Sequence, residues 1–221
     1  MLAGVRGVVT VVLVTGALGV SAVSSVQQPR TAHGRLFPPE QLGELEGPDR
    51  DEWQEPDRIM DELGIADGAR VADVGAGGGW FTVRLARRVG PNGRVFAEDI
   101  QRQMIDYIRR RVDREGLRNV ETVQGTAVDP RLPDNLDAVL IVDTYPQIET
   151  PVSMLKHLAK SLAPNGRLGI VDFRKDVYGP GPAMEERLEP EAIIRDASLA
   201  GLRLHAAHTF LRYQYLLVFT R

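Results

Sequence analysis

The chain of 221 residues contains no cysteine, and aromatic residues make up only 6% of it. Without cysteine, disulfide bonds, thiolate metal sites and cysteine nucleophiles are excluded. None of the four histidines has a ligand spacing supported by nearby carboxylates, so no metal site is predicted. The net charge of −3 gives no reason to expect a nucleic-acid partner.

One long apolar run is present, and it lies near the amino terminus. Arg6 precedes apolar residues 8–20, and small residues follow at Ser21, Ala22 and Ser24. This order is typical of a secretory signal peptide, with an uncleaved membrane anchor as the alternative. We therefore interpret residues 1–26 as a signal peptide or N-terminal membrane anchor. This interpretation predicts an exported, periplasmic or membrane-associated protein; a leader without function would leave the protein cytoplasmic.

The rest of the chain divides into a linker and one domain. Residues 27–50 are polar and rich in glycine and proline, which favours a linker. From residue 51 to 221, strand-like and helix-like patterns alternate, as is typical of βαβ units with a parallel sheet. We expect helices over 57–63, 80–89, 102–115, 152–162 and 190–200, and strands over 70–74, 94–99, 120–124, 136–143, 167–173, 203–209 and 213–220. The last two strands are too close in sequence for a parallel crossover and must form an antiparallel hairpin.

A glycine-rich loop, DVGAGGG over residues 73–79, lies between the first predicted strand and the next helix. Glycine permits a sharp turn and lets a ligand approach main-chain N–H groups. In open α/β sheets, ligands lie at the carboxyl ends of the strands. Asp99 ends the second predicted strand, where its carboxylate can accept hydrogen bonds from both hydroxyls of a ribose. Because strand side chains alternate, we expect Asp99 rather than Glu98 to face the ligand.

The loop must be compared with the dinucleotide-binding pattern G-x-G-x-x-G. From Gly75 and Gly77, the third glycine of that pattern would fall at position 80, which is Trp80. Asp73 precedes the glycines, where a carboxylate can pair with a cationic amino group but would repel a pyrophosphate. An NAD(P)-dependent oxidoreductase is therefore the less favoured alternative.

From about residue 53 to the carboxyl terminus, the chain resembles the class I S-adenosylmethionine-dependent methyltransferase family. Residues 71–79 (VADVGAGGG) match its first motif and residues 95–100 (VFAEDI) its second, while 124–127, 137–143 and 162–168 are similar to later segments. The resemblance implies an α/β fold, a three-layer sandwich with a mostly parallel seven-stranded sheet whose last strand is antiparallel. It also implies a methyltransferase domain over 51–221 with S-adenosyl-L-methionine as cofactor.

The resemblance also implies roles for individual residues. Asp73, Gly75 and Gly77 are expected to hold the methionine portion of the cofactor, and Asp99 its ribose. The segment after the third predicted strand is similar to the one that contacts the adenine. The full set of expected cofactor-binding residues is Asp73, Gly75, Gly77, Gly79, Asp99, Ile100, Thr126, Ala127 and Asp143.

Methyl transfer needs an aligned nucleophile, and it needs a general base only if the acceptor must lose a proton. Candidate groups are expected where the fourth and fifth strands end, at residues 143–147 and 172–175. We expect Asp143 to act as the base or as a cofactor ligand, and Tyr145 to shape the catalytic pocket, with ordinary packing as the alternative for Tyr145. Pro146 stands where relatives often carry histidine, which counts against a histidine base.

Two flanking segments are candidates for covering the site. Trp53 precedes the first predicted helix and is similar to an entry segment that folds over the cofactor; packing of the linker onto the domain is the alternative. Residues 176–188, with the sequence GPGP at their centre, are predicted to form a substrate lid or a plain surface loop.

The sequence therefore predicts an S-adenosylmethionine-dependent methyltransferase with a small-molecule acceptor that it does not identify. An exported, non-catalytic binding protein on the same scaffold is the alternative, because S-adenosylmethionine is made and kept in the cytoplasm whereas residues 1–26 resemble a leader.

Overall fold

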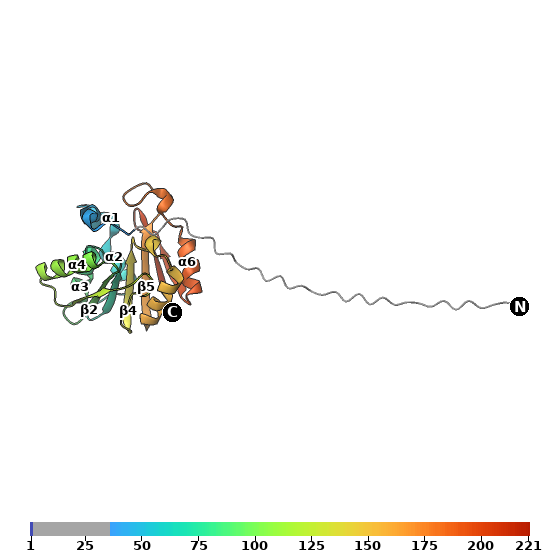
Figure 1. Cartoon of the computed structure of the whole chain (residues 1–221), viewed down its shortest axis with the longest axis horizontal. Helices are drawn as coiled ribbons and strands as arrows, with labels where there is room; N and C mark the ends of the chain where they lie inside the picture. The colour runs from blue at the N-terminus through green and yellow to red at the C-terminus, as the bar shows by residue number, and fades with distance from the viewer. Residues whose placement is uncertain (2–35) are drawn as a thin grey trace. The chain divides into compact units, whose positions relative to one another are not determined.

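The computed structural model describes Met1 and residues 36–221 (Figure 1). The predicted signal peptide or anchor beyond Met1, and residues 27–35 of the predicted linker, lie outside the described residues. In the part of the chain that the structure describes, no helix has both the length and the apolar character needed to cross a membrane.

Seven strands form one sheet in the order β3-β2-β1-β4-β5-β7-β6. The strands are β1 (Arg70–Val74), β2 (Arg94–Asp99), β3 (Val120–Gln124), β4 (Leu136–Val142), β5 (Leu162–Phe173), β6 (Arg203–His208) and β7 (Gln214–Thr220). Strands β1 to β5 are parallel, and β7 runs antiparallel to both β5 and β6. The predicted α/β class and the terminal antiparallel hairpin are confirmed.

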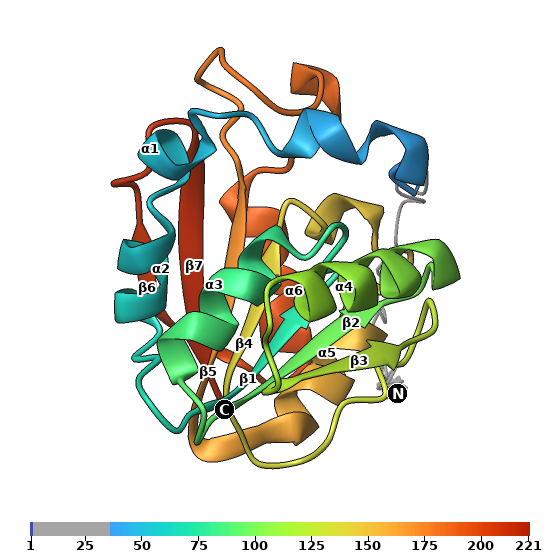
Figure 2. The same ribbon diagram turned by 90° about the vertical axis from the view of Figure 1, so that its left-hand side faces the viewer.

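Helices cover both faces of the sheet and make three layers (Figure 2). One face carries α2 (Pro56–Glu62), α3 (Trp80–Val89) and α4 (Arg102–Arg114), and the other carries α5 (Pro151–Ser161) and α6 (Pro190–Leu199). Alternate residues of each central strand enter opposite clusters: Leu140 packs with α2 and α3, whereas Ile141 packs with α5 and α6. This alternation is why β4 is apolar along most of its length.

The predicted elements are all present, with small differences at their ends. The largest difference is in β5, which begins at Leu162 rather than at residue 167. Leu162 pairs with Leu136 across an irregularity in the β4–β5 ladder, so the turn expected over 164–166 lies inside the strand.

The structure differs from the predicted linker over residues 36–50. This stretch contains the 3-10 helix η1 (Pro39–Leu45) and the start of α1 (Arg50–Gln54), and Leu42 is buried. The side chain of Gln101 donates a hydrogen bond to the carbonyl of Phe37 at 3.1 Å. Proline at the first turn of η1 starts a helix here instead of marking a flexible connection.

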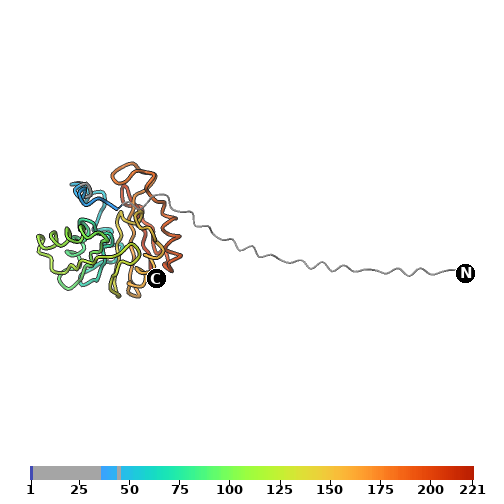
Figure 3. Tube along the Cα trace, in the orientation of Figure 1, coloured from blue at the N-terminus to red at the C-terminus, as the bar shows by residue number. Residues whose placement is uncertain are grey.

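Three segments gather at the carboxyl ends of the parallel strands: η1, α1 and the connection from β5 to α6, which contains η3 (Met184–Glu186) (Figures 2 and 3). Residues far apart in sequence thereby meet above the strand ends, where an open α/β sheet binds its ligands.

Candidate functional site

Two adjoining cavities lie at this end of the sheet. The first, with a volume of about 240 Å³, is bordered by the glycine-rich loop and by the ends of β1, β2 and β4. Eight of the nine predicted cofactor-binding residues line it: Asp73, Gly75, Gly77, Asp99, Ile100, Thr126, Ala127 and Asp143. The geometry thus brings together residues that the sequence spreads over 71 positions.

Glycine is required in the loop for two different reasons. Gly75 has a φ of +69°, and a Cβ there would lie 2.3 Å from the side chain of Thr144, so only glycine permits this close packing. Gly77 has a φ of +53°, and a Cβ on it would meet no atom within 4 Å. Because Gly77 lines the cavity, the space beside it is available to a ligand.

Gly79, the ninth predicted cofactor-binding residue, is not among the residues that line the cavity, and its role in cofactor binding stays a prediction. It precedes α3 with a φ of +78°, and a Cβ there would lie 3.5 Å from Ile108 of α4. That distance is an ordinary contact, so the positive φ at the start of the helix is what favours glycine at this position.

Asp99 is 6% exposed and holds the glycine-rich loop. Its Oδ2 accepts a hydrogen bond from the N–H of Gly77 at 3.0 Å, and its Oδ1 accepts one from the N–H of Gln101 at 2.9 Å. Each carboxylate oxygen can accept about two hydrogen bonds, so both retain a site for a ligand hydroxyl. A carboxylate that is fixed in this way, and that can only accept hydrogen bonds, fits the two hydroxyls of a ribose.

Glu98 lines the same cavity as Asp99, although the alternation of strand side chains predicts that only one of them faces it. Its Oε2 accepts a hydrogen bond from the N–H of Gly75 at 3.3 Å, while Oε1 is buried without a partner among the described residues. Strict alternation does not hold here, because the cavity wraps around the end of β2. Burial, followed by the charge of Asp99, raises the pKa of Glu98 to about 8.

Asp73 is the last but one residue of β1, at the start of the glycine-rich loop. It is 3% exposed, and its Oδ2 accepts a hydrogen bond from the hydroxyl of Thr82 at 2.6 Å. Burial raises the pKa of Asp73 to about 6, against the lowering effects of Thr82 and Arg50.

The charges of the first cavity favour a cationic ligand. Six carboxyl groups line it. Burial raises the pKa of four of them, those of Asp73, Glu98, Asp99 and Asp143. Among the described lining residues, Arg50 is the one cationic side chain. A sulfonium and an ammonium group would stabilise these carboxylates, so the residues present fit S-adenosylmethionine.

The second cavity, of about 560 Å³, shares Arg50 and Asp143 with the first. Its walls include the rings of Phe37, Trp53 and Phe173. Trp53 lies against Phe173 with ring centroids 6.0 Å apart, so the predicted entry segment borders this second cavity.

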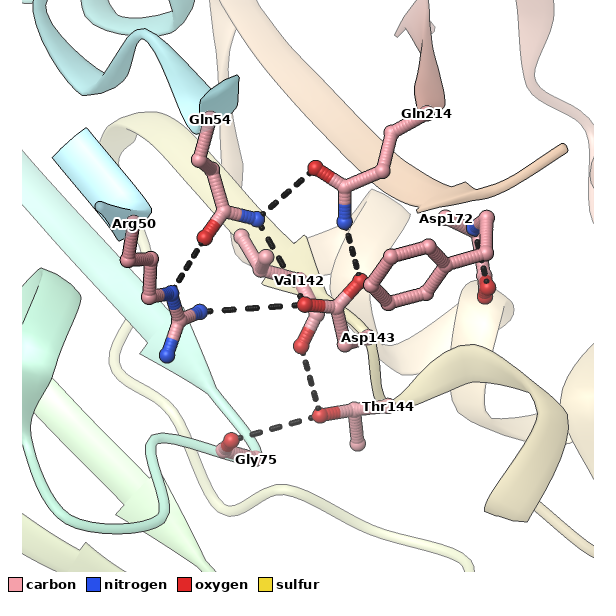
Figure 4. A network of polar contacts seen from close by, with 9 residues as sticks. Arg50, Gln54, Gly75, Val142, Asp143, Thr144, Asp172 and Gln214 are labelled. Carbon is pink, nitrogen blue, oxygen red and sulfur yellow. Dashed lines mark hydrogen bonds and ion pairs between the residues drawn. The ribbon is translucent and has the colours of Figure 1, made fainter. Parts of the chain in front are cut away.

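Asp143 lies at the centre of a polar network between the cavities (Figure 4). Its Oδ1 accepts a hydrogen bond from Gln214 at 2.5 Å, and its Oδ2 accepts one from Gln54 at 3.4 Å and lies 3.7 Å from Arg50. Asp143 directly follows β4 with a φ of +56°, a left-handed conformation that is uncommon outside glycine. Burial raises its pKa to about 6, although Arg50 and both glutamines lower it.

Tyr145 does not occupy the predicted pocket position. Its side chain is fully buried in the core with α5 and α6, and its hydroxyl donates a hydrogen bond to Asp196 at 3.1 Å. It is absent from the lining of both cavities, so the packing alternative describes it.

The connection from β5 to α6 borders the second cavity through Pro180, Gly181 and Pro182. Arg187 is 3% exposed and donates hydrogen bonds to main-chain carbonyls along this connection, including Pro180 at 3.1 Å and Pro182 at 3.0 Å. The predicted lid therefore lies beside the cavity and is held by one buried guanidinium.

Sequence reasoning missed Arg50, Gln54 and Gln214. Arg50 and Gln54 stand one helical turn apart, with Arg50 donating to Gln54 at 2.5 Å, but a five-residue helix is too short to show periodicity. Gln214 is a fully buried polar residue at the start of an apolar strand, which was a usable signal. Within the described ranges, no group of three or more potential ligands is arranged to hold a metal ion.

Comparison with known proteins connects this geometry to a family. A family model described as "Methyltransferase domain" matches residues 71–166. Ubiquinone/menaquinone biosynthesis C-methyltransferase UbiE of Pasteurella multocida is 34% identical over 128 residues, which cover 55% of this chain and 46% of that protein. The UbiE protein of Hahella chejuensis is 33% identical over 118 residues, covering 52% and 47%. The chain thus spans about half the length of the curated relatives it matches.

A solved structure matches over a longer range. The crystal structure of a SAM-dependent methyltransferase from Aquifex aeolicus is 29% identical, with a TM-score of 0.79, and the match covers 83% of this chain and 98% of that one. Neither the oxidoreductase nor the non-catalytic alternative is favoured by these similarities. With its strand order, its glycine-rich loop and the carboxylate that ends β2, the chain contains a methyltransferase domain and is similar in sequence and fold to the class I S-adenosylmethionine-dependent methyltransferases.

Proposed function

We propose that this protein transfers a methyl group from S-adenosylmethionine to a small, flat and largely apolar molecule bound in the second cavity. The observation that carries the proposal is that Asp143 lines both cavities. The aromatic rings of the second cavity favour a flat acceptor, because ring faces stack on flat apolar surfaces.

The residues of the first cavity bind and orient the cofactor. Asp99 accepts hydrogen bonds from the ribose, Asp73 receives the ammonium group, and the open space at Gly77 admits the methionine portion. When bound, the cofactor supplies an electrophilic methyl group on a positively charged sulfur. Holding donor and acceptor in line can contribute roughly 7–11 kcal/mol toward the barrier.

Asp143 is suited to accept the proton that the acceptor loses. A base works best when its pKa lies near the working pH, and burial raises that of Asp143 to about 6. Gln54 and Gln214 fix its orientation, and each carboxylate oxygen keeps an acceptor position. With the cofactor bound, Asp143 would take the proton that the acceptor loses, while the acceptor's electron pair would bond to the methyl carbon and the carbon–sulfur bonding pair would return to sulfur.

The experiment is methyl transfer from [methyl-³H]S-adenosylmethionine to a low-molecular-weight metabolite extract. The wild type and Asp134→Asn, an exposed carboxylate away from both cavities, are expected to label extractable small molecules. Asp143→Asn is expected to lower the rate by about 10²–10⁴-fold, the usual contribution of a general base, with cofactor affinity changed far less. Label in protein or nucleic acid alone, or no label despite cofactor binding, would contradict the proposal.

We further propose that residues 1–26 direct the protein to or across a membrane, as their order of charged, apolar and small residues suggests. Subcellular fractionation and amino-terminal sequencing of the mature protein test this. Recovery in the cytosol with Met1 intact would contradict it.

A further inference from the structure

Asp172 is a buried carboxyl group with an unused oxygen beside the second cavity. It precedes the last residue of β5, is 1% exposed, and lines that cavity. Its Oδ1 accepts a hydrogen bond from the N–H of Phe173 at 2.8 Å, whereas Oδ2 is without a hydrogen-bond partner among the described residues. A buried polar atom left unsatisfied is costly, so a group that enters the cavity is its natural partner.

Burial favours the neutral form of Asp172. Burial, and then the charge of Asp143, raise the pKa of Asp172 well above the ordinary value, against the lowering effects of the Phe173 N–H and of Arg187. Arg50 pairs with Asp143 instead, and Figure 4 shows Arg50 and Asp172 on opposite sides of Asp143. A protonated carboxyl is a hydrogen-bond donor, which an ionised one is not.

We propose that Asp172 selects the acceptor, by donating a hydrogen bond from its carboxyl group to a hydroxyl or carbonyl oxygen of an uncharged aromatic molecule. This inference rests on the proposed function, since it needs the second cavity to hold the acceptor. The cavity adds the flat walls of Trp53 and Phe173 for the aromatic body. Asp143 and Asp172 then have different tasks: one accepts a proton and the other donates a hydrogen bond.

Beside Asp172, an amine cation is less favoured than an uncharged hydroxyl or carbonyl group, although Asp49 and Glu186 also line the cavity. The charge of Asp143 is already balanced by Arg50 at 3.7 Å. A cation beside Asp172 would be stabilised only if the carboxyl group ionised, and burial raises the pKa of that group. Binding probes that differ in a single group can distinguish the two acceptor classes.

The test is equilibrium dialysis of three probes against the full chain saturated with S-adenosylhomocysteine: 1-naphthol, 1-methylnaphthalene and 1-naphthylmethylamine. The wild type is expected to bind 1-naphthol about tenfold more tightly than 1-methylnaphthalene, the effect of one buried hydrogen bond. Asp172→Leu, which keeps the size but has no donor, is expected to lose this preference. Asp172→Asn, whose amide still donates, is expected to retain most of it. A purely structural role for Asp172 would weaken all probes together and leave their ratio unchanged.

The outcomes separate this inference from the proposed function. Equal binding of 1-naphthol and 1-methylnaphthalene by the wild type, or an unchanged preference in Asp172→Leu, would overturn the role of Asp172 alone. Tightest binding of 1-naphthylmethylamine would overturn it in favour of a cationic acceptor. No binding of any probe, with S-adenosylhomocysteine bound, would contradict the acceptor cavity and therefore both proposals. Should Asp172→Leu fail to fold, the wild-type ratio and Asp172→Asn still decide the matter.

Discussion

The N–H of Gly77 donates a hydrogen bond to Oδ2 of Asp99 at 3.0 Å, which ties the loop after β1 to the end of β2. The residue that we propose admits the ligand is thereby joined to the residue that we propose binds its ribose. Removing either should impair cofactor binding, but for different reasons.

Replacing Asp99 removes the carboxylate that we propose binds the ribose of the cofactor. Asp99→Asn should weaken S-adenosylmethionine binding by about 10- to 100-fold, because hydrogen bonds to a charged group contribute roughly 1.5–3 kcal/mol. Calorimetric titration measures the affinity, and Asp113→Asn, which alters an exposed carboxylate of α4, is the matched control. Equal affinities for the wild type and Asp99→Asn would show that Asp99 does not bind the ribose.

Gly77→Ala tests the open space in the loop, and Gly68→Ala is its matched control. Both glycines have positive φ, +53° and +80°, and in neither would a Cβ meet an atom within 4 Å. Each substitution should cost about 1–2 kcal/mol of folding stability through backbone strain. Only Gly77 borders the first cavity, so Gly77→Ala alone should weaken cofactor binding, by at least about tenfold through the added clash. Similar cofactor affinities for the two variants would contradict this assignment.

From the raised pKa of Glu98 we predict that the stability of the folded protein depends on pH. In the folded protein its pKa is raised from 4.5 to about 8, so protonation of Glu98 stabilises the folded state relative to the unfolded state. That stabilisation is complete below about pH 4.5 and is lost as the pH rises through about 8, with a limit of about 5 kcal/mol set by 1.36 kcal/mol per pKa unit. Urea unfolding of the cofactor-free protein should show a smaller fall between pH 6 and pH 9 in Glu98→Gln than in the wild type. Parallel curves for the two proteins would argue against a raised pKa.

We expect Arg187 to hold the connection between β5 and α6 in place beside the second cavity. It donates to the carbonyls of Arg174 and Val177 at 2.8 Å, in addition to those of Pro180 and Pro182. Arg187→Met should lower the free energy of unfolding by about 3 kcal/mol, because several buried acceptors lose a charged donor.

Hydrogen exchange over residues 176–186 should also become faster in Arg187→Met. Arg174→Met, which breaks an exposed ion pair with Asp176, should change little. Unaltered exchange in Arg187→Met would mean that other contacts hold the connection.

The sequence predicted the fold well because the signals of a parallel sheet are local. Apolar strands and amphipathic helices alternate, and Asp99 stands at a strand end that the pattern locates. Glu98 was misjudged because alternation describes the middle of a strand and not the cavity around its end.

Other parts of the site depend on tertiary contacts. Gln54 and Gln214 lie 160 positions apart and meet at 2.9 Å, which no local pattern indicates. We predicted a linker over residues 36–50 from their proline and glycine content. Proline is also common at the starts of short helices, so this composition does not distinguish the two structures. We predicted Tyr145 in the catalytic pocket because it follows Asp143 closely in sequence. The left-handed conformation of Asp143 turns the chain between them, so the two side chains point in different directions.

A crystal structure of the full chain with S-adenosylhomocysteine would show whether the two cavities serve the methyl donor and the acceptor. We expect the ribose hydroxyls within hydrogen-bond distance of Asp99, the methionine portion beside Gly75 and Gly77, and the sulfur directed toward Asp143 and the second cavity. A nucleoside bound away from Asp99, or a sulfur directed away from the second cavity, would contradict this expectation.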